Sequence, residues 1–403
     1  MSVNYEILTP DTVPAYVART PHLRERVDAD SLQVEEVGDG NLNLVFICRD
    51  AEGRGVCLKQ SLPYVRLVGE SWPLTPDRIL AEARGLGAGA AFAPGLVPDF
   101  YGVDPEMHVL AMEYLQGWGM FRSELNVGHA YPGVEDDLGR YVARVAFNTS
   151  YFGVDQGEMK QRVADAVNPE LCRITEDLVF TEPYIDVDNN SFVDDLTPEV
   201  MALRDDAALR AEVGLLKFRF MTAAEILVHG DLHTGSVMVR RGDDGPECRV
   251  IDAEFCYYGP VGFDLGALFG NFLAARARAA VLGRPDDFRA WLDGAGPGVW
   301  DAFAGEMRRQ WPSRLDPTWT DDFLERWLDR VAVDTIGFGG CKAIRRIIGL
   351  AKVTDIEDLP PDEHLAAATI VLRTARRWVR DRETLSTVAA ANAVFDEIAA
   401  EVL

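Results

Sequence analysis

The sequence predicts an α+β protein with a small N-terminal part built on an antiparallel sheet and a larger, mainly helical part after it. Three observations support this fold class. Runs rich in Val, Ile, Leu and Phe dominate the chain to about residue 115, amphipathic helical patterns follow Gly117, and one short hairpin pattern lies inside the helical part. The 403 residues are enough to bury a large core in two or three compact units.

The N-terminal part contains three strand-like runs, at residues 32–50, 53–60 and 108–115, separated by turns with Gly or Asp. A helix is predicted between the second and third runs, over residues 75–87. Thr75 suits its cap and Pro76 its first position, and apolar residues recur on one face at Ile79, Ala83 and Leu86. One helix is therefore expected to pack on the sheet.

The C-terminal part shows its longest helical patterns at residues 136–152, 209–227 and 362–383. Two strand-like runs, residues 236–241 and 248–255, are joined by the turn sequence GDDGPE, which predicts a small hairpin among the helices.

The composition describes a folded, acidic chain. Forty Lys and Arg against sixty-five Asp and Glu give a net charge of −25, which disfavours nucleic acid and anionic membranes as partners because both require a basic face. The six cysteines form no CxxC pair and are expected to be buried thiols in a reducing compartment, so we expect a cytoplasmic location. Neither a secretory signal nor an apolar stretch long enough to span a membrane is recognisable.

The loop between the first two strand-like segments, Gly38 to Asn43, carries two glycines. Such a turn lets backbone N–H groups approach a phosphate closely. An ordinary hairpin turn explains the same residues.

Lys59 ends the next strand-like run and is one of five lysines in a chain whose other basic residues are arginines. A strand lysine can reach nucleotide phosphates, and Glu82 on the following helix is placed to hold it, as in protein kinases. The alternative is a surface lysine with a solvated glutamate.

The strongest signal is the segment from Val228 to Ser236, VHGDLHTGS, followed after one strand by Asp252 and Glu254. Phosphoryl transfer needs one carboxylate to orient and deprotonate the attacking hydroxyl and others to hold Mg²⁺ against the phosphates, and Asp231 followed by Asp252 meets that order. His229, Asp231 and His233 also have the spacing of a metal-ligand cluster, which leaves a metal-dependent hydrolase as an alternative.

These residues resemble the small-molecule kinases related to aminoglycoside phosphotransferases and choline kinases, whose catalytic loop reads HGDxHxxN. Within that superfamily the sequence is most similar to the methylthioribose kinase family, in the blocks GDGNLNLVF, VGESWPLTPDR, NPELCRITEDLVFTEP, HGDLHTGS, DAEFCYYGPVGFDLG and GFGGCKAIRRIIGLA. The resemblance covers almost the whole chain. It implies a two-lobed protein-kinase-like fold with a nucleotide-binding lobe at residues 1–115 and a catalytic, substrate-binding lobe at residues 116–403, an ATP- and Mg²⁺-dependent sugar kinase, and a homodimer.

The resemblance also implies roles for single residues. Asn41, Asn43, Lys59 and Glu82 would serve the nucleotide, with Glu113, Tyr114 and Leu115 as the segment that meets adenine. Asp231 would be the catalytic base, and Asp252 and Glu254 the metal ligands. Trp72, Asp231, Arg345 and Arg346 would contact the sugar. Because neighbouring helix positions are about 100° apart, one arginine of the pair is expected to face the site and the other to pack outward.

Two departures from the superfamily pattern stand out. Ser236 replaces its usual metal-binding Asn, as in the methylthioribose branch, and Asp-Ala-Glu replaces the expected Asp-Pro-Glu. Altered surroundings of a metal site can accompany an altered sugar. A kinase of 5-deoxyribose or another small alcohol therefore remains an alternative, as does a nucleotide-binding pseudokinase. For Trp72 the alternative is a loop anchor, and for the arginine pair a helix surface.

Overall fold

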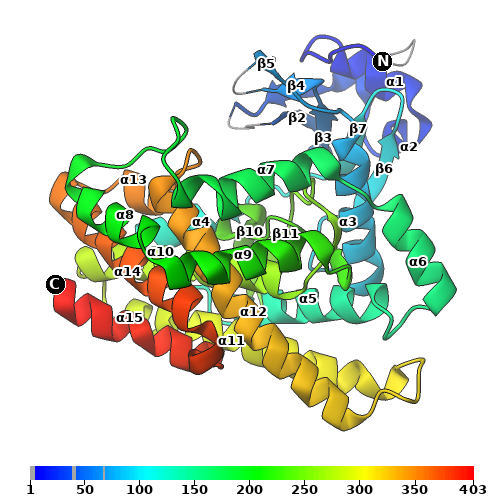
Figure 1. The fold of residues 1–403 in the computed structure, drawn as a ribbon. Helices are drawn as coiled ribbons and strands as arrows, with labels where there is room; N and C mark the ends of the chain where they lie inside the picture. The colour runs from blue at the N-terminus through cyan, green and yellow to red at the C-terminus, as the bar shows by residue number, and fades with distance from the viewer. Residues whose placement is uncertain (1–4, 39–41, 67–68) are drawn as a thin grey trace.

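A computed structural model describes residues 5–38, 42–66 and 69–403. The chain forms two lobes, as predicted: a sheet-based N-terminal lobe, blue to cyan in Figure 1, stands over one end of a larger helical lobe. The α+β fold class is therefore confirmed.

The N-terminal lobe is an antiparallel five-stranded sheet in the order β1-β2-β3-β7-β6. Its strands are β1 (Gln33–Glu36), β2 (Asn43–Arg49), β3 (Gly55–Ser61), β6 (Phe100–Asp104) and β7 (Val109–Glu113). Helices α1 (Val13–Arg19) and α2 (Pro21–Arg24) share a buried apolar cluster with β2, β3 and β7. The sheet thus has one core of its own and presents the inner end of β3 to the other lobe.

The helix predicted over residues 75–87 is α3 (Arg78–Phe92). Thr75 does not cap it: the Thr75 hydroxyl accepts a hydrogen bond from the Asp77 backbone at 3.3 Å, and the residues before Arg78 form a turn. The hairpin of β4 (Tyr64–Val65) and β5 (Gly69–Pro73) precedes this turn and carries Trp72 toward the helical lobe.

The helical lobe contains most of the helices. They are α4 (Phe121–Val127), α5 (Val134–Thr149), α6 (Gln156–Asp165), α7 (Pro169–Phe180), α8 (Thr197–Arg204), α9 (Ala207–Thr222), α10 (Gly262–Val281), α11 (Asp286–Gln310), α12 (Asp321–Ile348), α13 (Thr354–Glu357), α14 (Pro361–Leu385) and α15 (Val388–Val402). The division near residue 115 stays a prediction; the main sheet ends at Glu113, and β8 (Gly119–Met120) already pairs with a strand of the helical lobe.

Helices α10 and α12 form the centre of this lobe and approach each other through glycines. A Cβ atom on Gly266 would lie 2.7 Å from the backbone nitrogen of Gly339, and one on Gly270 would lie 2.5 Å from the Gly339 carbonyl. Such distances require a side chain of hydrogen at these positions. The contact fixes α12 against α10, and both helices carry residues of the site.

The predicted hairpin is present as β10 (Val237–Gly242) and β11 (Gly245–Val250), joined by two residues and extended by β8. The second strand ends at Val250, five residues earlier than expected, because Asp252 takes a left-handed backbone conformation with φ of 70°. A second pair, β9 (Ile226–Val228) with β12 (Tyr257–Gly259), flanks it. The segment between β9 and β10, residues 229–236, is called the catalytic loop below.

Among the helices of the described ranges, none combines the length and apolar character needed to cross a membrane.

Candidate active site

The nucleotide side of the site centres on Lys59, near the end of β3. Its ammonium lies 2.8 Å from a Glu82 carboxylate oxygen of α3 and forms a second ion pair with Asp252, after β11. The Lys59 and Glu82 side chains are 8% and 2% exposed, so the surface lysine and solvated glutamate of the alternative interpretation do not exist. The ion pair of Lys59 with Asp252 joins the two lobes.

A second layer supports these residues. The Asn43 amide donates to Glu254 Oε2 at 2.6 Å and its oxygen accepts from Arg78 at 2.7 Å. The Arg78 guanidinium, which is 1% exposed, also donates to the carbonyls of Leu62 and Leu42. Asn43 therefore lies within a buried network beneath the Asp252–Glu254 segment, and its role as a nucleotide contact stays a prediction. Asn41 lies outside the described residues.

The charges of this side shift several pKa values. Burial lowers the pKa of Lys59, but the carboxylates of Asp252 and Glu82 raise it more, so Lys59 is a firm cation. Burial raises the pKa of Glu82 to about 7 despite Lys59. Burial also raises the pKa of Glu254, whereas Lys59 brings that of Asp252 below its usual value. The result is one cation surrounded by acids that are costly to keep charged.

Glu82, Asp252 and Glu254 are suited to a divalent cation. One carboxylate oxygen from each lies within 4.8 Å of the others, and carboxylate oxygens are the ligands that Mg²⁺ prefers. Of this group only Asp252 is open to the cleft, with its side chain 44% exposed. The donor set thus fits a divalent cation such as Mg²⁺, and the assignment of Asp252 and Glu254 as its ligands stays a prediction.

The backbone of the catalytic loop is fixed by a close contact at a glycine and by hydrogen bonds to a carboxylate of α10. Gly230 has φ of 84°, and a Cβ there would lie 2.2 Å from the Phe255 carbonyl, so only glycine fits. The Asp264 carboxylate, in the first turn of α10, accepts hydrogen bonds from the backbone N–H groups of His229 and Gly230 at 2.7 and 2.9 Å. These contacts fix the backbone immediately before Asp231.

Asp231 is paired with Lys342 of α12. The Lys342 ammonium donates to Asp231 Oδ1 at 2.6 Å and lies 4.4 Å from the centre of the Phe263 ring. His233 Nε2 lies 3.4 Å from Asp231 Oδ2, and the Ser236 hydroxyl, which is 1% exposed, donates to the Asp231 carbonyl. The Ser236 hydroxyl therefore makes its hydrogen bond within the catalytic loop.

Among the described residues, the group whose donor atoms could share a metal ion is Glu82, Asp252 and Glu254, so the loop histidines do not form the metal cluster of the hydrolase alternative. His229 Nε2 lies 2.8 Å from the Ile251 carbonyl, and burial lowers the pKa of His233 to about 4, which leaves it neutral. Burial raises the pKa of Asp231, but Lys342 and His233 bring it well below its usual value. Both histidines act as supports of an ionised Asp231.

Arg345 and Arg346 are both buried, at 7% and 9% exposure, and the Asp231 carboxylate acts on the pKa of each. The expectation that one of them packs outward is wrong, because both guanidinium groups are buried and feel the negative charge of Asp231. The Arg345 Nε atom is buried without a hydrogen-bond partner.

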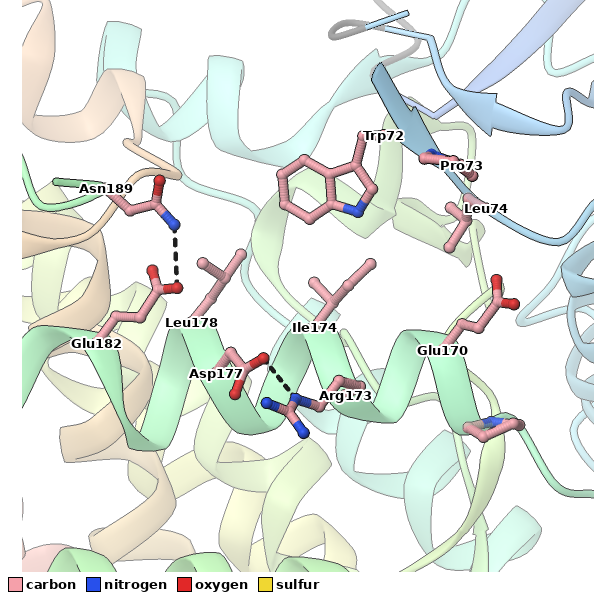
Figure 2. Close-up of a pocket in the computed structure, with 11 residues that line it drawn as sticks. Trp72, Pro73, Leu74, Glu170, Arg173, Ile174, Asp177, Leu178, Glu182 and Asn189 are labelled. Carbon is pink, nitrogen blue, oxygen red and sulfur yellow. Dashed lines mark hydrogen bonds and ion pairs between the residues drawn. The ribbon is translucent and has the colours of Figure 1, made fainter. Parts of the chain in front are cut away.

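Trp72 lies apart from these residues, on one wall of a cavity of about 430 Å³ between β5 and α7. Figure 2 shows its indole facing Ile174 and Leu178 of α7. Glu170, in the first turn of α7, accepts a hydrogen bond from the Thr75 backbone at 2.5 Å and ties the two walls together. The structure does not line this cavity with Asp231 or the arginine pair.

The segment from Glu113 to Leu115 leaves the sheet at the end of β7. Glu113 pairs with Val56 of β3, and its carboxylate accepts a hydrogen bond from the Asp99 backbone at 3.2 Å. The segment connects the lobes, and its contact with adenine stays a prediction.

Four supporting residues escaped the sequence interpretation: Lys342, Arg78, Asp264 and Asn168, whose amide donates to the Glu254 carbonyl at 2.8 Å. Lys342 had a usable signal, because the rarity of lysine that singled out Lys59 applies to it equally. Spacing gave no signal for the other three: Asn43, His229 and Glu254, which Arg78, Asp264 and Asn168 contact, lie 35, 35 and 86 residues away in the chain.

Comparisons with known proteins show what the chain is similar to. Residues 33–334 match the phosphotransferase enzyme family. The methylthioribose kinase of Geobacillus kaustophilus is 41% identical over 389 residues, which cover 96% of this chain and 96% of that protein. The methylthioribose kinase of Pectobacterium atrosepticum is 43% identical over 360 residues, covering 86% and 87%. Among solved structures, a choline/ethanolamine kinase family protein from Mesorhizobium loti covers 95% of this chain and 99% of its own, with a TM-score of 0.45 and 17% identity.

Proposed function

Because the chain belongs to the phosphotransferase enzyme family and, within it, to the methylthioribose kinases, we propose that it transfers the γ-phosphoryl group of ATP to the anomeric hydroxyl of 5-methylthioribose. The product is the 1-phosphate, and the reaction is a step of methionine salvage. The enzyme is a phosphotransferase with an alcohol group as acceptor.

The observation that carries this assignment is that one site contains both Asp231, oriented by its ion pair with Lys342, and a separate acidic cluster around Lys59. In the transfer, the anomeric oxygen forms a bond to the γ-phosphorus while its O–H bond breaks and the proton passes to Asp231. The bond from the γ-phosphorus to the bridging oxygen breaks, and its electron pair leaves on ADP. Asp231 is the catalytic base of this scheme.

We assign the nucleotide side to ATP and Mg²⁺. Asp252 and Glu254 would hold the metal, whose charge, when it is bound, stabilises the negative charge that develops on the phosphates. Lys59 would contact the phosphates and is positioned for this by Glu82. Glu113, Tyr114 and Leu115 would border the adenine, and Asn43 supports Glu254.

The acceptor would lie between Asp231 and the cavity at Trp72. Trp72, Ile174 and Leu178 offer an apolar wall suited to a methylthio group, while Arg345 and Arg346 supply charged donors for ring hydroxyls and the transferred phosphoryl group. On the cavity rim, Glu170 accepts a hydrogen bond from the Thr75 backbone, Asp177 is ion-paired with Arg173, and Glu182 accepts a hydrogen bond from Asn189.

Steady-state ADP release with 5-methylthioribose, 5-deoxyribose, ribose and an aminoglycoside tests the acceptor. Ribose should have a kcat/KM roughly 10²-fold lower, since it loses the apolar contact and buries a hydroxyl in its place. The aminoglycoside should give no turnover above the rate without acceptor. Equal efficiency with ribose would contradict methylthioribose as the preferred acceptor and leave the kinase class intact; phosphate release without any acceptor would instead favour a hydrolase.

Two further proposals follow from the same family. We expect a homodimer, measured by light scattering on the purified protein, and a cytoplasmic location, consistent with six free cysteines.

A further inference from the structure

Lys342 has an unusual environment for a lysine. It lies on the buried half of α12, its side chain is 4% exposed, and among the described residues its ammonium has one carboxylate within ion-pair distance, that of Asp231. Removing an ammonium from water costs several kcal/mol. Besides Asp231, the ammonium lies over the Phe263 ring, 4.4 Å from its centre. Because burying the ammonium is costly and Asp231 is its ionic partner, the role of Lys342 is to be sought at Asp231.

The two carboxylate oxygens of Asp231 have different neighbours. Lys342 Nζ lies 2.6 Å from Oδ1, whereas Oδ2 faces His233 Nε2 at 3.4 Å, beyond a good hydrogen bond. We infer that Lys342 is a positioning residue for phosphoryl transfer: it holds Oδ1, leaves Oδ2 to receive the acceptor proton, and keeps the carboxylate ionised. This inference rests on the proposed function of Asp231 as the base.

The surrounding charges are consistent with this role. Arg345 and Arg346 of α12 and His233 of the loop also face Asp231, while Arg122 of α4 is paired with Asp355 of α13. Asp264 of α10 is committed to the backbone of the loop. Among these groups, Lys342 is the cation in direct contact with the carboxylate.

The arrangement has a consequence for the substrate. A carboxylate stabilised by an ammonium is a weak base, so it suits an acceptor hydroxyl that gives up its proton readily. An anomeric hydroxyl is more acidic than an ordinary alcohol because the ring oxygen withdraws electrons. Lys342 therefore adapts the site to a hemiacetal hydroxyl rather than a primary alcohol.

The test compares Lys342→Met, which keeps length and removes charge, with Lys342→Arg, which keeps charge. Profiles of kcat/KM against pH are measured for 5-methylthioribose at saturating ATP and Mg²⁺. In Lys342→Met the acid limb should move up by at least one pH unit and kcat should fall roughly tenfold or more, with KM for ATP unchanged. Lys342→Arg should keep the acid limb of the wild type. A Lys342→Met enzyme with the wild-type profile and kcat would overturn the inference.

Lys352→Met is the matched control. Lys352 follows the same helix and is tied to the carbonyls of Ser191 and Ile347 rather than to a carboxylate. Its loss should leave the pH profile unchanged even if it lowers the melting temperature. A shifted acid limb in Lys352→Met would show that any lysine lost here perturbs the site and would count against Lys342.

If Lys342→Met is too unstable for kinetics, melting temperatures provide a second test. Asp231→Asn leaves Lys342 buried without its partner, so adding Lys342→Met to it should not lower the melting temperature further. An additional loss equal to that of Lys342→Met alone would mean that Lys342 stabilises something other than Asp231, and the inference would be wrong. The activity of the wild-type enzyme tests the proposed function separately.

Discussion

The two sides of the site carry opposite charge. On the nucleotide side, Glu82, Asp252 and Glu254 outnumber Lys59 and Arg78, which leaves one negative charge in excess. On the acceptor side, Lys342, Arg345 and Arg346 outnumber Asp231, which leaves a formal excess of two positive charges when every group is ionised, although burial lowers the pKa of Lys342 to about 8. The first side is thus built to receive a metal cation and the second an anion, and a phosphoryl group moving from one to the other meets favourable charge in both places.

Replacing Asp231 with Asn should have the largest effect. Loss of a general base costs roughly 10²–10⁴-fold in rate, whereas the nucleotide side does not contact Asp231 and should keep its affinity for Mg-ATP. Turnover and calorimetric binding of Mg-ATP measure the two. A variant within a few-fold of the wild-type rate would remove Asp231 from its role, and weakened ATP binding would mean that the two sides are not separate.

Replacing Asp252 with Ala should have the converse effect. The affinity for ATP should lose its dependence on Mg²⁺, a change of roughly 10²-fold, because the carboxylate most open to the cleft is removed. Calorimetry with ATP at several Mg²⁺ concentrations measures this. The same Mg²⁺ dependence in the variant would contradict the assignment of Asp252 as a metal ligand.

The buried His233 should make stability fall in mild acid. Burial lowers its pKa from the usual 6.5 to about 4, so the unfolded chain takes up the proton first and stability is lost as pH falls from about 6.5 to 4. The loss is at most about 3 kcal/mol. Urea unfolding at several pH values should show this loss reduced in His233→Gln. The exposed His22 provides the control variant His22→Gln, and equal pH dependence in all three proteins would contradict a neutral His233.

The smallest effect is expected from Gly266→Ala in α10. The new methyl group would meet the backbone of Gly339 at 2.7 Å, which should cost about 1–3 kcal/mol of unfolding free energy and lower kcat without changing ATP affinity. Gly294→Ala in α11 is the control, because no atom lies within 4 Å of its added Cβ. It should be neutral or slightly stabilising. Denaturant unfolding compares the two, and equal losses would contradict a close contact at Gly266.

The sequence predicted those features that are encoded over short distances. Strand-like runs, the hairpin from residue 236 to 255 and the motif residues Lys59, Asp231 and Asp252 could be identified because pattern and spacing reveal them. The cap at Thr75 was misplaced because the chain makes an additional turn before Arg78. The burial of both Arg345 and Arg346 could not be predicted from helical spacing, since the carboxylate that acts on both, Asp231, comes from a segment more than a hundred residues earlier in the chain.

The contact of α10 with α12 limits how the enzyme can be altered. Asp264 and Lys342, which hold the catalytic loop and its base, stand on these two helices, and their separation is set by glycines that admit no larger residue. Helix α7 packs against both helices through Phe180 at its C-terminal end, whereas Ile174 and Leu178 line the cavity, so these two residues can be varied without displacing the base. Directed evolution toward new acceptors should therefore accumulate its substitutions on α7 and the Trp72 strand, while the paired helices remain unchanged.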